Sequence, residues 1–190
     1  KSNLKEGVVA MGAPFRDREF RRTLIFLTAF TIASGFAGNL FGAYAFETLK
    51  MSMTALQVTA ICHAIGNIAS IRMWGFFGDK YGNKPVLAIL TVGIAVTPMP
   101  WIFCVPGQDL YNATILGIGH ILAGICWGGI SVCQFNLLLA TAKEEDRANY
   151  IGAGMALQAL MGAVAPLLGA IVMLQMRLHI GGTLAYHWIF

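Results

Sequence analysis

Charge is what this sequence has least of. Only 12% of its 190 residues are Asp, Glu, Lys or Arg, whereas 57% are hydrophobic. Soluble globular domains carry about 25% charged and about 45–50% apolar residues. One small core could not bury so much apolar surface. The scarcity of charge therefore excludes an ordinary soluble domain and indicates a chain that lies in a membrane.

Carboxylates are missing from the middle of every long apolar run, so the sequence offers no membrane-embedded proton relay of that kind. The four cysteines match no zinc spacing and are typical of free thiols packed among apolar side chains. A nucleotide-binding loop and a nucleophile paired with a base are also absent. We therefore expect no enzyme activity, no cofactor, no metal and no nucleic-acid partner.

Five apolar runs reach the length of about 20 residues that carries a helix across a bilayer core. They are residues 23–46, 56–77, 85–105, 112–141 and 150–176. A sixth run begins near Thr183 and is still apolar at Phe190. The runs predict an all-α membrane protein. Residues 1–22 would be a cytoplasmic linker, and residues 23–190 a transmembrane helical half-bundle truncated at its C-terminus.

The basic residues predict the orientation. Ten of the 13 Lys and Arg fall in the N-terminal segment, the turn after the second run and the loop after the fourth. Two fall on the opposite side, Lys50 and Arg177, and Arg72 lies within the second run. Because positive charge concentrates in cytoplasmic loops, we expect the N-terminus of this chain in the cytoplasm.

Small residues and prolines recur inside the runs. Glycines four residues apart let two helices approach closely in lipid, and prolines bend a helix by removing a backbone hydrogen bond. The positions are Gly38 and Gly42, Gly124 and Gly128, and Pro98, Pro100 and Pro166. Close packing alone and a bundle of bent helices that rocks are both compatible with this pattern.

The turn between the second and third runs, Gly75 to Pro85, contains an Asp and two Lys between long apolar flanks. Asp79 would lie at the C-terminal end of a helix, where the helix dipole disfavours a carboxylate by about 0.3–1 kcal/mol. It therefore needs a basic side chain or the N-terminus of another helix as a partner. Gly82 permits a tight turn, and Pro85 suits the first turn of the next helix.

This turn resembles the loop motif of major facilitator superfamily (MFS) transporters, G-x-x-x-D-(R/K)-x-G-x-(R/K). The matching positions are Gly75, Asp79, Lys80, Gly82 and Lys84. The resemblance implies an MFS-type transmembrane helix bundle with five complete spans and the start of a sixth. It also implies that these five residues form a loop that sets the balance between conformational states.

Three further segments resemble the C-terminal half of poorly characterised bacterial members, namely residues 14–22, 74–87 and 134–139. The resemblance implies the bacterial cytoplasmic (inner) membrane and a missing N-terminal half of the same polypeptide as a partner. Pro166 resembles a glycine-proline motif in fifth helices of some antiporters, which keeps assignment to the N-terminal half open.

Polar groups at mid-membrane depth are candidates for a binding site. The candidate substrate pocket consists of Asn39, His63, Asn67, Trp127, Gln134 and Asn136. Hydrogen bonding or packing between helices is the alternative role for each of them, and His63 and His120 could also take part in proton coupling. Arg72 is close enough to the helix end to serve in gating or orientation.

Together these observations predict a secondary active transporter, present here as a partial chain, that moves a small solute across the lipid bilayer by alternating access. The alternative is a non-transporting membrane sensor or scaffold with the same fold. Neither the solute nor the coupling ion can be read from the sequence.

Overall fold

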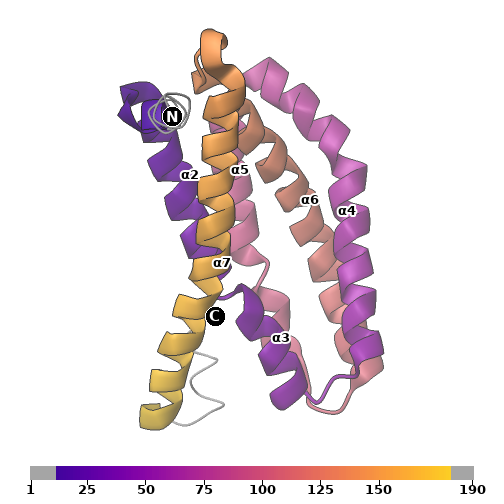
Figure 1. The fold of residues 1–190 in the computed structure, drawn as a ribbon. Helices are drawn as coiled ribbons and strands as arrows, with labels where there is room; N and C mark the ends of the chain where they lie inside the picture. The colour runs from indigo at the N-terminus through magenta and orange to yellow at the C-terminus, as the bar shows by residue number, and fades with distance from the viewer. Residues whose placement is uncertain (1–11, 181–190) are drawn as a thin grey trace.

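The computed structural model describes residues 12–180 and contains no strand within them (Figure 1). Its helices are α2 (Arg18–Phe36), α3 (Gly38–Glu47), α4 (Met53–Tyr81), α5 (Asn83–Val96), α6 (Asp109–Thr141) and α7 (Arg147–Ile180). Two short 3-10 helices, η1 (Met99–Phe103) and η2 (Glu144–Asp146), lie between them, and a short helical stretch at residues 12–16 precedes α2. The predicted sixth run, from Thr183, lies outside the described residues.

Five segments of the described chain are long and apolar enough to cross a membrane, which confirms the five predicted spans. Their bounds are Arg18–Glu47, Met53–Tyr81, Asn83–Phe103, Asp109–Thr141 and Glu144–His179. Apolar side chains cover the outside of the bundle, as a lipid environment requires, and Leu110 is 84% exposed. The helices extend a few residues past the apolar runs at several of their ends.

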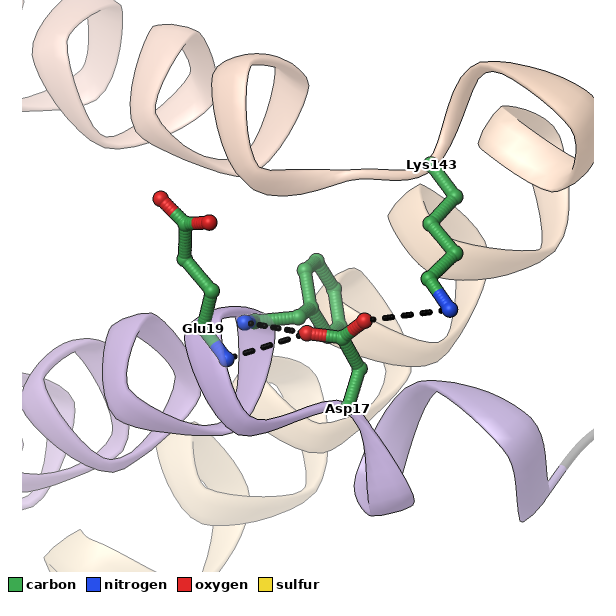
Figure 2. A network of polar contacts seen from close by, with 4 residues as sticks. Asp17, Glu19 and Lys143 are labelled. Carbon is green, nitrogen blue, oxygen red and sulfur yellow. Dashed lines mark hydrogen bonds and ion pairs between the residues drawn. The ribbon is translucent and has the colours of Figure 1, made fainter.

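The N-terminus of α2 shows why. Asp17 caps it by accepting hydrogen bonds from the backbone N–H groups of Glu19 and Phe20, at 3.0 and 3.1 Å (Figure 2). The hydrogen bond from Phe20 lowers the pKa of Asp17. Lys143, after α6, lies 3.4 Å from the same carboxylate, and this contact raises the pKa of Lys143. A polar cap thus starts the helix before its apolar run begins.

Two of the five spans are not continuous α-helices. The first span breaks at Ala37, and Figure 1 shows α3 displaced from the line of α2. Here the backbone carbonyl of Phe36 lies against Gly169 of α7, where no Cβ would fit. The third span changes from α-helix to the 3-10 helix η1 beside Pro98, as the prolines predicted. Pro166, in contrast, stays inside the continuous helix α7.

Helix pairs build the bundle: α4 packs along α6, α2 along α7, and α5 along α6. Glycines bring α4 and α6 together. A Cβ on Gly66 would overlap the carbonyl of Ile121, and a Cβ on Gly124 would overlap the carbonyl of His63. The predicted close approach at Gly124 and Gly128 is therefore confirmed. The pair at Gly38 and Gly42 makes no such contact in the described chain, because no heavy atom lies within 4 Å of either added Cβ.

Candidate functional site

The loop between α4 and α5 is one residue long. Gly82 separates the two helices with φ 89° and ψ 148°, and its N–H donates to the carbonyl of Gly78 at 2.9 Å. Residues with a Cβ rarely adopt a positive φ of this kind, whereas glycine adopts it readily. The tight turn predicted at Gly82 is confirmed. The chain needs glycine here because the turn requires a positive φ.

The loop is held from the side by α6. Asn136 on α6 donates its Nδ2 to Oδ1 of Asn83, the first residue of α5, at 3.0 Å. Gly78 leaves room for this pair, since a Cβ there would lie 2.8 Å from Oδ1 of Asn83. Gly78 and Asn83 were not among the predicted site residues, because both fall on unspecified positions of the motif.

Asp79 lies in the last turn of α4, as predicted, and its side chain is exposed. Within residues 12–180 it makes no hydrogen bond or ion pair. Its neighbour Lys80 turns to the aromatic rings of Tyr81 and Phe76, with Nζ 5.1 and 5.8 Å from their centroids. The unfavourable carboxylate at the end of the helix is therefore uncompensated in the part of the chain that the structure describes.

A cavity of about 520 Å³ lies deeper in the bundle, where the two broken spans meet α4 and α6. Ala37 and Gly38 bring the first break to its wall, and Thr97 and Pro98 bring the second. The aromatic and histidine residues that line it are Phe30, Phe41, His63, Trp101, His120 and Trp127. Its volume falls in the range of about 300–1,000 Å³ that is typical of small-molecule sites.

The rings of the cavity contact one another across different helices. Phe30 of α2 and Trp127 of α6 meet edge to face, with centroids 5.9 Å apart. Phe41 of α3 lies 5.1 Å from Trp101 of η1, which in turn lies 6.0 Å from His120 of α6. Such pairs stabilise by about 0.5–1.5 kcal/mol beyond the area they bury. Ring contacts thus tie both broken spans to α6.

His120 has a defined tautomer. Its Nδ1 lies 2.8 Å from the carbonyl oxygen of Leu116, which can only accept, so Nδ1 carries the proton when the ring is neutral. Nε2 then has a lone pair. The N-terminal end of α3 has no side-chain cap, but it adjoins the C-terminal end of α2 at Ala37, so the opposite dipole ends of the two helices largely cancel at the wall of the cavity.

Comparison with known proteins decides the family. The family model of the Major Facilitator Superfamily matches residues 2–187, nearly the whole chain. The chain belongs to the major facilitator superfamily. The membership confirms the resemblance seen in the Gly75–Pro85 turn and accounts for the helical bundle.

The relatives of this MFS chain are distant in sequence. It is 24% identical over 108 residues to the uncharacterized MFS-type transporter YuxJ of Bacillus subtilis (strain 168), covering 57% of the chain and 26% of that protein. It is 27% identical over 117 residues to a putative proline/betaine transporter of Staphylococcus haemolyticus (strain JCSC1435), covering 60% of the chain and 24% of the relative. The matched part thus spans about a quarter of the length of these relatives. No solved structure matches the chain.

Of the six pocket residues predicted for this MFS chain, the structure places His63 and Trp127 on the cavity. The other four lie elsewhere. Asn39 is exposed on α3, and Asn67 has its backbone against Gly124 and Gly128. Asn136 holds the loop, and Gln134 has a buried Nε2 without a hydrogen-bond partner among the described residues.

Arg72 is exposed on α4 and does not line the cavity. In the sequence it lies between His63, which lines the cavity, and Gly75, where the loop motif begins. Three aromatic wall residues, Phe30, Phe41 and Trp101, were not predicted, because aromatic side chains are common everywhere in apolar runs and only polar groups stand out there. Trp101 could have been found from the two prolines that come just before it, Pro98 and Pro100.

Proposed function

We propose that this MFS chain is part of a secondary active transporter that moves a small solute across the membrane by alternating access. The observation that carries the proposal is the cavity at the breaks of the first and third spans. Transporters commonly build solute sites from discontinuous helices near the middle of the bilayer, at the interface between two halves. In this proposal the chain is the C-terminal half, and the absent N-terminal half covers the cavity.

The same proposal gives the loop residues Gly75, Asp79, Lys80, Gly82 and Lys84 the role of a conformational switch. Asp79 supports it, because its carboxylate is exposed and unpaired among residues 12–180. A helix N-terminus or a basic group of the other half would compensate the charge in one state of the transport cycle and leave it in another. Residues 1–22 would then be a cytoplasmic linker, and the membrane would be the bacterial inner membrane.

Uptake by the full-length protein in proteoliposomes tests the proposal. The panel of solutes includes proline and betaine, because the name of the Staphylococcus haemolyticus relative mentions both. We expect saturable uptake of at least one solute in the wild type. Asp79→Asn should impair uptake without reducing membrane insertion, whereas Glu145→Gln, which changes an exposed carboxylate of η2, should leave uptake unchanged.

Two results would contradict the proposal. A correctly inserted wild-type protein that moves no solute would favour the sensor or scaffold interpretation. Full uptake by Asp79→Asn would remove the loop from the switching mechanism while leaving the transporter assignment intact.

A further inference from the structure

The cavity is rich in rings and poor in charge. Four aromatic side chains line it from four different elements: Phe30 from α2, Phe41 from α3, Trp101 from η1 and Trp127 from α6. None of the described residues that line it is Asp, Glu, Lys or Arg. The hydroxyl groups of Ser34, Thr91 and Thr97 are already used as donors to backbone carbonyls of their own helices.

This lining discriminates between kinds of solute group. A carboxylate or a primary ammonium is strongly hydrated, and its burial requires a countercharge or several hydrogen bonds. A quaternary ammonium has no N–H group, so it requires no acceptors. The faces of Trp, Tyr and Phe rings attract such a cation, and aromatic cages are a known means of recognising quaternary ammonium ligands.

We propose that this cavity binds the quaternary ammonium group of a small solute, with Trp127 and Phe30 on one side and Trp101 and Phe41 on the other. The proposal rests on the proposed transport function and narrows it to a substrate class. One ring pair joins α2 to α6 and the other joins α3 to η1, with centroids 5.9 and 5.1 Å apart. Contacts between the rings therefore hold them in place before the solute arrives.

Choline and its neutral carbon isostere, 3,3-dimethylbutan-1-ol, separate charge from shape. Binding of each to the full-length protein in detergent is measured by titration calorimetry. A cation–π contact predicts that choline binds about 2- to 30-fold more tightly than the isostere. Equal affinities for the two probes, or no binding of choline, would overturn the proposal, because apolar shape alone would then account for the site.

Variants of one ring assign the effect to this cavity. Trp127→Leu should lower the affinity for choline by about 2- to 30-fold and leave the affinity for the isostere nearly unchanged. Trp127→Phe keeps an aromatic face and should lose less, which guards against a variant that fails to fold. Phe135→Leu is the matched control, since Phe135 lies on the same helix, is 46% exposed and does not line the cavity. A loss as large in Phe135→Leu as in Trp127→Leu would overturn the assignment.

Uptake measured on the same protein separates this inference from the broader one. Saturable uptake of a solute without an ammonium group, together with no choline binding, would refute the substrate class and leave the transporter intact. Choline binding that depends on Trp127 supports the cavity as an ammonium site even where no uptake follows. In that case the proposed transport function would be refuted and the proposed binding site would stand.

Discussion

The contact between α4 and α6 gives the sharpest quantitative prediction. Gly128 of α6 is buried against α4, and an added Cβ would lie 2.8 Å from Oγ of Ser70 and 2.9 Å from the carbonyl oxygen of Asn67. Ordinary contacts of a Cβ begin at 3.4 Å. Gly128→Ala therefore forces the two helices apart by about 0.5 Å, because the backbone of α4 cannot yield as a flexible side chain would.

The separation weakens hydrogen bonds that join the helices. Ser70 and Trp74 of α4 both donate to the carbonyl of Ile125 on α6, at 3.2 and 2.8 Å. An increase of about 0.5 Å takes the Ser70 bond out of hydrogen-bonding range. Overpacking costs about 1–3 kcal/mol and a lost interhelical bond in a membrane about 0.6 kcal/mol. Replacing a helical glycine by alanine regains about 0.5–1 kcal/mol, which leaves a net loss of about 0.6–3 kcal/mol.

The assay is thermal unfolding of the full-length protein in detergent, followed by circular dichroism. Gly152→Ala is the matched control, because Gly152 lies in α7 and an added Cβ there meets no heavy atom within 4 Å. We expect the unfolding midpoint to fall for Gly128→Ala and to stay equal or rise slightly for Gly152→Ala. Equal midpoints for the two variants would refute the close approach of α4 and α6.

Two further predictions concern the ends of the helices. Asn136→Ala removes the donor to Asn83 Oδ1, which should lower the free energy of unfolding by about 0.5–1.5 kcal/mol, and an unchanged midpoint would show that α6 does not hold the loop. The depressed pKa of Asp17, caused first by the N–H of Phe20 and then by Lys143, gives a pH dependence. The stabilisation is fully present above the ordinary pKa of 3.8 and is lost as the pH falls through the lower folded value. In an acid titration of stability Asp17→Asn should lack this loss, and parallel curves for variant and wild type would contradict the cap.

Most of the fold could be predicted because the bilayer imposes it. An apolar run of about 20 residues has few options other than a helix, so the spans follow from hydropathy. The turn was equally predictable. Gly82 adopts φ 89°, and a glycine between two charged residues and a proline is a sequence signal for such a turn. The break at Ala37 was not predictable in the same way. No proline stands there, and the contact that accompanies it comes from Gly169, more than a hundred residues away in the chain.

The cavity could be predicted only in part, because depth in the membrane does not tell which way a residue faces. Gln134 and Asn136 are two residues apart on α6, so they project about 200° apart around the helix. Asn136 points to the loop, and Trp127, nine residues before it, lines the cavity on the other side. Asn67 was predicted to line the pocket because of its depth, yet its backbone lies in the contact with α6. The direction in which a side chain points depends on which helices pack against each other. Helix pairing is a property of the tertiary structure and cannot be read from one apolar run.

The helix pair α4–α6 connects the two candidate sites. The carbonyl of His63 lies against Gly124, and the side chain of the same residue lines the cavity. Gly124 therefore determines how α4 lies along α6, and this position also determines where His63 lies. Towards its other end, α6 holds the loop through Asn136 and Asn83. A displacement of the loop that slides α4 along α6 must then move His63 at the cavity wall, because packed helices shift as units and not residue by residue. Coupling between loop and cavity needs no chain of side-chain relays in this arrangement. It needs only that the contact at Gly124 stays close, which is why enlarging that residue should affect solute binding as well as stability.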